Sequence, residues 1–129
     1  MIRFTILFLF FLVSCELYNK KQIILISDSQ LLEILDSDHI LVDVRTSEEY
    51  DSGYIQNALN YDYYSESFVN EILSLEKNSS IILYCRTNNR STKTANFLQE
   101  NGYEKIFVLR DGITEWVKND NDLTYTSPK

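Results

Sequence analysis

The feature of this chain that most limits its fold is a series of short apolar runs separated by segments with helical spacing. The longer runs cover residues 22–26, 39–44, 80–84 and 105–109, and residues 58–61 form a shorter one. Runs of this length that are rich in Ile, Val and Leu are typical of strands buried on both faces. Because strands and helices alternate, the sequence predicts an α/β fold, an open parallel sheet flanked by helices on both faces.

The intervening segments carry helix signals of different strength. Ser27 to Gln30 has the form of a capping box ahead of residues 31–35, and a helix that follows Cys85 should end at Gly102. Weaker signals predict one helical turn over 46–50, a helix over 65–75 and a last short helix over 113–117. In the second of these, the apolar residues expected on one face are Phe68, Ile72 and Leu75.

The first residues read as an export signal. A short basic start precedes an apolar run over 4–13, which is too short to cross a bilayer but has the length of a signal-peptide core. Ser14 and Cys15 follow it, and a small residue directly before a cysteine at this place resembles the bacterial lipoprotein box. We therefore expect a signal peptide over 1–14 and lipidation of Cys15. The alternative is an ordinary cleaved signal or an uncleaved anchor, with Cys15 incidental.

Either alternative places the domain outside the cytoplasm, and the lipid-anchored form is expected in the bacterial cell envelope, facing the periplasm or the exterior. A polar tether over 15–21 would connect the lipid anchor to the domain. With 129 residues, of which 44% are hydrophobic, the chain suits one globular domain, expected over 22–118. The polar residues 119–129 are expected to form a loose tail.

The net charge of the chain limits its partners. It is −7 for the whole sequence and becomes −8 once Arg3 is removed with the signal, since 11 Lys and Arg then face 19 Asp and Glu. An acidic surface is poorly suited to nucleic acid and to anionic lipid head groups, so we expect no nucleic-acid partner and attachment through acyl chains alone. Lipidation of Cys15 would also leave Cys85 as a free, exposed thiol.

Cys85 stands where an apolar run ends and a loop begins. Helical spacing resumes from Ser91, so the loop amides and the helix dipole should direct positive charge at the sulfur. A thiol with a reference pKa of about 8.5 can fall to roughly 3.5 to 7.5 in such surroundings, which predicts that Cys85 is a thiolate nucleophile. The alternative is a small buried hydrophobe. The candidate substrate-binding residues are Arg86, Thr87, Asn88, Asn89, Arg90 and Ser91.

Several of these side chains have alternative interpretations. Arg86 is expected to point outward toward an anionic substrate and Arg90 to bond loop carbonyls, while the alternative for each is a solvated surface charge. The hydroxyls of Ser91 and Thr92 either cap the following helix or hydrogen-bond the thiolate. Tyr61, Tyr63 and Tyr64 either line an entrance to the site or belong to the core.

Charged residues elsewhere are assigned to the scaffold. Asp43 and Arg45 are expected to form a structural ion pair with Glu49 nearby. His39 is the only histidine and lies far from the loop in sequence, which makes a Cys-His dyad or a histidine-based metal site improbable. Trp116 is assigned to the core.

Five segments taken together resemble the rhodanese family. They are residues 41–45, 48–50, 53–60, 85–91 and 111–116, in the order and at the spacing typical of that family. The resemblance implies a parallel sheet with flanking helices and a single-domain sulfurtransferase. In this family the loop cysteine, here Cys85, carries sulfur as a persulfide from thiosulfate or a similar anionic donor to cyanide or a thiol acceptor. It implies no metal and no organic cofactor.

The chain departs from the usual family pattern at some positions. Tyr54 stands where the family often has His, and Gln56 and Asn57 replace Pro and Gly, with little effect expected. Asn88 replaces a Gly at a position expected to need a positive φ, which Asn tolerates best among the other residues. Asp111 replaces the first Gly of a pair and brings a carboxylate toward the loop.

Two other functions compete with sulfur transfer. One is a non-enzymatic module that carries persulfide to a single partner or merely binds it. The other is a phosphatase or arsenate reductase, because related enzymes with these activities share the fold. Those enzymes have a loop one residue longer, whereas four residues separate Cys85 from Arg90 here.

Overall fold

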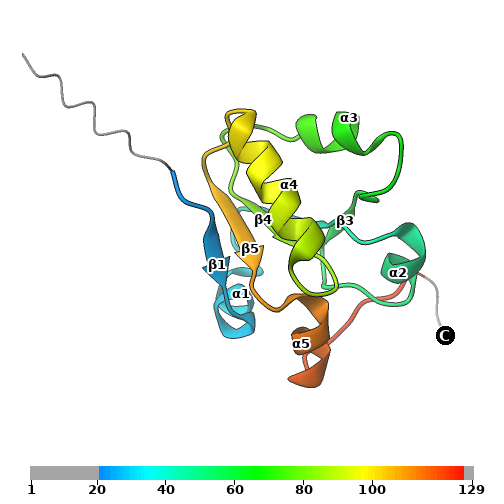
Figure 1. The fold of residues 1–129 in the computed structure, drawn as a ribbon. Coiled ribbons are helices and arrows are strands. Elements are labelled where there is room, and N and C mark those ends of the chain that lie inside the picture. The colour runs from blue at the N-terminus through cyan, green and yellow to red at the C-terminus, as the bar shows by residue number, and fades with distance from the viewer. Residues whose placement is uncertain (1–20, 127–129) are drawn as a thin grey trace, which may run out of the picture.

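The computed structural model describes residues 21–126 and contains a five-stranded sheet in which every strand pair is parallel. Cys15 and the expected signal segment lie outside the described residues. The spatial order of the strands is β1-β5-β4-β2-β3, and Figure 1 shows β1, β5, β4 and β3 one after another in this order. Their bounds are β1 Ile24–Ile26, β2 Ile40–Asp43, β3 Leu59–Asn60, β4 Ile81–Tyr84 and β5 Ile106–Leu109.

Helices cover both faces of the sheet, as the sequence predicts. The core divides into two clusters: one lies under α3 and α4, and the other lies under α1 and α5. The helices have the bounds α1 Asp28–Ile34, α2 Ser47–Asp51, α3 Phe68–Leu73, α4 Asn89–Glu100 and α5 Gly112–Lys118. None of the helices within residues 21–126 has the length and apolar character needed to cross a membrane.

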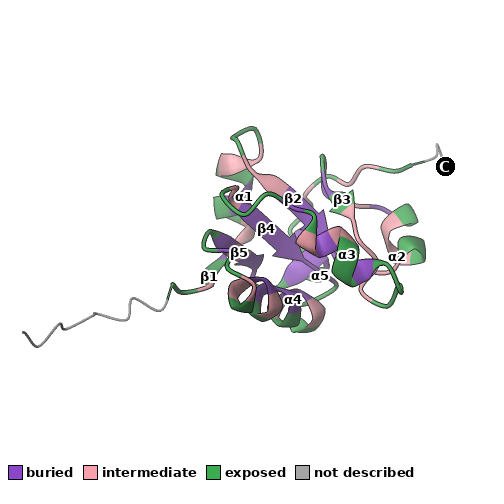
Figure 2. Cartoon of the chain, turned by 90° about the horizontal axis from the view of Figure 1, so that it is seen from above, coloured by how far each residue is buried: buried purple, intermediate pink, exposed green. Residues whose placement is uncertain are grey.

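Strand β4 is buried on both faces, which fixes the position of the residue that follows it. Ile81 and Leu83 face the cluster under α3 and α4, whereas Ile82 and Tyr84 face the other cluster. Figure 2 shows this strand as a buried element in the middle of the sheet. Cys85 therefore leaves the sheet at its centre, at the carboxyl end of the strands, where ligands bind in folds of this class.

The buried ion pair of Asp43 and Arg45 lies at the same end of the sheet. Asp43 is fully buried and Arg45 is 5% exposed, and the guanidinium NH2 group donates to Asp43 Oδ2 at 2.7 Å and to the Gly53 carbonyl at 2.7 Å. Burial lowers the pKa of Arg45, but the hydrogen bonds and charge of Asp43 outweigh that effect and leave the pKa raised. Loss of either partner would leave a buried unpaired charge, which costs about 3–5 kcal/mol.

Local helix signals are confirmed where a side chain caps the backbone. Ser27 and Gln30 form the expected capping box at the start of α1, and Thr46 and Glu49 form a second one at the start of α2. Helix α3 begins at Phe68 instead of residue 65, because the preceding serines form turns, with the Phe68 N–H donating to the Ser65 carbonyl.

The loose tail predicted from residue 119 is not what the structure shows up to residue 126. Leu123 packs against the cluster under α1 and α5, and Thr124 pairs with Tyr54 in an antiparallel bridge. The indole N–H of Trp116 donates to the Asp122 carbonyl at 2.9 Å. Although the segment is polar, its backbone groups form hydrogen bonds with the domain, and these bonds hold it against the domain surface.

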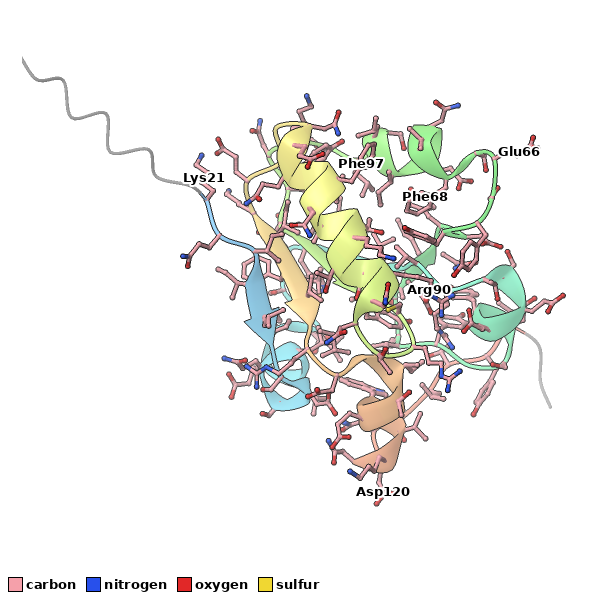
Figure 3. The ribbon with its side chains drawn as sticks, in the orientation of Figure 1. Lys21, Glu66, Phe68, Arg90, Phe97 and Asp120 are labelled. Carbon is pink, nitrogen blue, oxygen red and sulfur yellow. The ribbon has the colours of Figure 1, made fainter. Side chains whose placement is uncertain are left out.

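The first described residue lies at the opposite end of the sheet from Cys85. Lys21 precedes β1 (Figure 3) and forms an ion pair with Glu104, which precedes β5. Because β1 and β5 are parallel, the two residues of this ion pair lie at the amino ends of the strands. The chain thus enters the domain at one end of the sheet and places its loop cysteine at the other.

Candidate functional site

Cys85 is held between the end of β4 and the start of α4, and it is buried. The residue is 1% exposed and belongs to the core cluster under α3 and α4. Its expected exposure is therefore wrong, because β4 ends deep in the middle of the sheet. The side chain nevertheless forms part of the wall of a surface pocket, described below.

The start of α4 aims one backbone amide at this sulfur. The helix begins at Asn89, two residues before the position expected from the sequence, so Ser91 lies inside its first turn. An N–H at that position has no partner within the helix and is normally satisfied by a capping side chain. Here the Ser91 N–H donates to Cys85 Sγ at 3.5 Å, and the Ser91 hydroxyl lies 3.3 Å from the same sulfur.

Asn88 is the N-cap residue but does not cap the helix with its side chain. Its amide group donates to the Arg110 carbonyl at 3.1 Å, which leaves the first-turn amides of α4 to other acceptors. The backbone of Asn88 has φ −149°, so the positive φ predicted there is wrong. Asn57, the other asparagine that replaces a family glycine, does adopt a positive φ of 68°.

The start of α5 fixes the first part of the loop. The Ile113 N–H donates to the Cys85 carbonyl at 3.0 Å, and the Thr114 N–H and hydroxyl donate to the Arg86 carbonyl at 3.1 and 2.8 Å. Gly112 makes this approach possible. It has φ +63°, and a Cβ at this position would lie 2.2 Å from the Thr87 carbonyl oxygen and 2.6 Å from that of Arg86.

Arg90 forms a bidentate ion pair with Glu49 across α4 and α2. The two guanidinium nitrogens donate to the two carboxylate oxygens at 2.7 and 2.9 Å. This corrects the expectation that Arg90 bonds loop carbonyls: it lies on the side of α4 that faces α2 (Figure 3). The Tyr64 ring centroid lies 5.8 Å from its Cζ, within the range of a cation–π contact.

The ion pair shifts the pKa values of both partners in the direction that keeps them charged. The hydrogen bonds from Arg90 lower the pKa of Glu49 to about 2, against the effect of burial. Those same hydrogen bonds raise the pKa of Arg90, and attraction to Glu49 and to the Cys85 sulfur adds to the rise. Glu49 also accepts the Thr46 N–H at 2.8 Å, so one carboxylate caps α2 and binds α4.

A surface pocket of about 490 Å³ opens beside the sulfur. Neither the Arg86 guanidinium nor the Lys93 ammonium has an ion-pair partner within residues 21–126, and no carboxylate lines the pocket. This arrangement favours a small anion next to Cys85. The lining residues are Tyr64, Cys85, Arg86, Thr87, Asn89, Arg90 and Lys93.

Lys93 was not among the residues predicted for the site. It lies three positions after Arg90, so the two residues share one side of α4. That helical spacing was the signal in the sequence that could have identified it.

Other residues considered from the sequence lie outside this pocket. Asp111 lines a separate pocket near α1 together with Asp28 and Glu115, away from the sulfur.

His39 lies at the amino end of β2 beside Lys105, at the opposite end of the sheet. Tyr61 and Tyr63 pack against the core, and Trp116 is buried. Residues 21–126 contain no cluster of three or more His, Cys, Asp or Glu side chains able to hold a metal ion.

A family model described as Rhodanese-like domain matches residues 27–119. Curated proteins similar to this chain include the tRNA uridine(34) hydroxylase of Buchnera aphidicola, 29% identical over 117 residues that cover 84% of this chain and 37% of the relative. The protein of that name from Escherichia coli is 29% identical over 91 residues, covering 67% of this chain and 26% of the relative. The chain thus spans between about a quarter and just over a third of the length of these relatives.

Solved structures show the same fold. A rhodanese-like domain protein from Staphylococcus aureus has a TM-score of 0.69 and 29% identity, covering 81% of this chain and 100% of that one. A rhodanese-related protein from Thermoplasma volcanium has a TM-score of 0.69 and 24% identity, covering 78% of this chain and 97% of that one. The second likeness concerns the fold alone.

Replacing Gly112 by Ala should displace the loop as well as strain the backbone. Gly102→Ala is the matched control, because Gly102 also has a positive φ of +89° but a Cβ there would meet only Lys77 Nζ at 3.7 Å. We expect Gly102→Ala to lower the free energy of unfolding by about 1–2 kcal/mol, and Gly112→Ala by about 1–3 kcal/mol more. Urea unfolding measures both, and equal losses would contradict the close approach of Gly112 to the loop.

The Glu49–Arg90 ion pair should contribute to stability in a pH-dependent way. Because the pKa of Glu49 is about 2 in the folded protein and higher in the unfolded chain, its contribution is present above about pH 4.5 and is lost as the pH falls toward 2. At pH 7 we expect Glu49→Gln to lower the free energy of unfolding by about 1 kcal/mol. The difference from the wild type should shrink between about pH 5 and pH 2.

The matched control is Glu48→Gln, which changes the exposed neighbouring carboxylate on the same helix. Unfolding by urea at a series of pH values should show no comparable dependence for this variant. A difference between the wild type and Glu49→Gln that stays constant from pH 5 to pH 2 would contradict the ion pair in solution.

Proposed function

The chain belongs to the family of rhodanese-like domains, and from this premise we propose that it is a sulfurtransferase that carries sulfane sulfur as a persulfide on Cys85. The observation that supports the proposal is the placement of the sulfur: Cys85 Sγ accepts the Ser91 N–H at the start of α4. It also borders a pocket lined by three cationic side chains and no carboxylate. Both features favour the binding of an anionic substrate beside the sulfur.

The first step of the proposed reaction loads the cysteine. Thiosulfate or a similar dianion binds next to Arg86 and Lys93, the two pocket cations without an ion-pair partner in the described chain. The Cys85 thiolate attacks the outer sulfur of thiosulfate, the S–S bond of the donor breaks, and sulfite leaves with the electron pair. Positive charge in the pocket stabilises the departing anion, and the step uses protein groups alone.

The second step passes the sulfur on. A persulfide places the reactive atom one S–S bond, about 2.05 Å, beyond Cys85 Sγ. Cys85 is only 1% exposed, but its side chain lines the pocket. The added sulfur atom therefore brings the reactive atom closer to an acceptor in the pocket. Cyanide or an acceptor thiolate attacks the outer sulfur, the S–S bond breaks, and Cys85 leaves as the thiolate.

Two other activities fit the structure less well. A loop that surrounds a tetrahedral oxyanion needs its arginine free, whereas both ends of the Arg90 guanidinium are occupied by Glu49. The tRNA hydroxylation named for the curated relatives also fits less well, since the chain spans only 26% to 37% of those proteins and its net charge of −7 disfavours a nucleic-acid substrate. A dedicated persulfide carrier remains the alternative, distinguished by fast transfer to a co-purified protein and poor small-molecule turnover.

Cys85→Ser should abolish thiosulfate-dependent transfer of sulfur to cyanide. Intact-mass measurement after incubation with thiosulfate should show a gain of one sulfur atom in the wild type and none in the variant. Arg86→Gln, which keeps the sulfur, should raise KM for thiosulfate about tenfold, because it removes a charge-assisted contact. Equal activity of Cys85→Ser and the wild type would overturn the proposal, and vigorous phosphate release from an aryl phosphate would favour a phosphatase.

We further propose that Cys15 is lipidated and anchors the protein in the cell envelope, facing the periplasm or the exterior. The support is the apolar run followed by Ser14 and Cys15. In a bacterial host that processes lipoproteins, the wild type should fractionate with membranes, and Cys15→Ser should lose its acyl mass. Cys85→Ser is the matched control and should keep it. Identical masses for wild type and Cys15→Ser, after allowance for the substitution, would exclude the anchor.

A further inference from the structure

A mainly apolar groove of about 300 Å³ lies between α3 and α4, away from the loop. Figure 3 shows Phe97 on the side of α4 that faces α3, with Phe68 at the start of α3 opposite it. Val69 is 50% exposed there, although its neighbour Phe68 is buried. The groove is lined by Tyr63, Phe68, Val69, Lys93, Thr94 and Phe97.

The groove adjoins the pocket beside Cys85, since the two have one lining residue in common. Lys93 lines both, and Arg90, Lys93, Thr94 and Phe97 follow one another at helical spacing along a single side of α4. At a rise of about 1.5 Å per residue, the distance along the helix from Ser91, next to the sulfur, to Phe97 is about 9 Å. A small molecule of that length reaches from the sulfur into the groove.

The order of chemical groups from Cys85 to the groove indicates which groups a matching ligand should carry. The reactive sulfur comes first, then the ammonium of Lys93, which has no ion-pair partner within the described chain, and then the apolar walls. A matching ligand has a thiol, an anionic group close to it, and an apolar body beyond. Most small-molecule sites combine apolar walls with a few polar groups that fix orientation in this way.

We propose that the groove is the acceptor subsite and that it binds the apolar body of a carboxylated thiol of the kind represented by an N-acylated cysteine. The inference rests on the proposed sulfur transfer. The acceptor thiolate attacks the outer sulfur of the Cys85 persulfide, the S–S bond breaks, and Cys85 leaves as the thiolate while the acceptor becomes the persulfide. Lys93 binds the acceptor carboxylate, and the acyl chain lies against Val69 and Phe97.

The test compares acceptors that differ in one part only, with the purified protein and thiosulfate as donor. N-hexanoyl-L-cysteine should exceed N-acetyl-L-cysteine in kcat/KM by about tenfold, because its longer chain is buried in the groove. Val69→Ser should reduce this ratio to about threefold or less. Val117→Ser is the matched control, since Val117 on α5 is 49% exposed, and it should leave the ratio unchanged.

The carboxylate is tested in the same way. The methyl ester of N-hexanoyl-L-cysteine should react several-fold more slowly than the acid, and Lys93→Gln should remove most of that difference. Equal kcat/KM for the two acyl chains, or equal loss of the ratio in Val69→Ser and Val117→Ser, would overturn the subsite. Persulfide formation on Cys85 and transfer to cyanide would still stand in that case, so failure of the subsite is distinguishable from failure of the proposed function.

A binding measurement makes the subsite testable even without turnover. N-hexanoyl-S-methyl-L-cysteine cannot accept sulfur, and its titration should shift the NMR signals of Val69 and Phe97 while leaving those of Val117 in place. Absence of shifts in the groove would overturn the proposal. A change in oligomeric state of Val69→Ser with an unchanged acceptor ratio would assign the groove to a second copy of the chain, and would also overturn it.

Discussion

The hydrogen bond from the Ser91 N–H to Cys85 Sγ is the interaction on which the site depends. Three features of the chain produce it. Strand β4 is buried on both faces and places Cys85 in the middle of the sheet, and α4 begins early enough to include Ser91 in its first turn. In addition, the Asn88 side chain donates to the Arg110 carbonyl instead of capping the helix. A sulfur atom thereby takes the place of the usual capping oxygen. The positive end of the α4 dipole points at this sulfur, so the local fold also determines which charge is favoured beside it.

The charges around the pocket have distinct tasks. Glu49 binds Arg90, so this arginine connects α2 to α4 and contributes its charge from a fixed position. Arg86 and Lys93 are exposed and are available to a mobile anion. The chain as a whole has a net charge of −7, so these two cations beside the sulfur form a local region of positive charge. This region favours a small anion, whereas the rest of the acidic surface would repel a large polyanion.

The sequence was sufficient for the features that depend on neighbouring residues. Runs of apolar residues located the strands, the capping box of Ser27 and Gln30 located α1, and the flanks of Cys85 identified the loop. It was insufficient where distant segments meet. The Arg90–Glu49 pair joins residues 41 positions apart, the burial of Cys85 follows from the strand order, and the packing of Leu123 depends on a surface that α1 and α5 form together. None of these contacts leaves a periodic signal in the chain.

The parallel sheet has a consequence for how the molecule would be oriented near a boundary. Lys21 enters at the amino ends of the strands, and the sulfur lies at their carboxyl ends. An anchor at Cys15 would be connected to Lys21 by a chain that spans at most about 21 Å when fully extended. A connection of this length is too short to let the domain turn over. The pocket beside Cys85 would therefore face away from the lipid, toward partners in the aqueous phase.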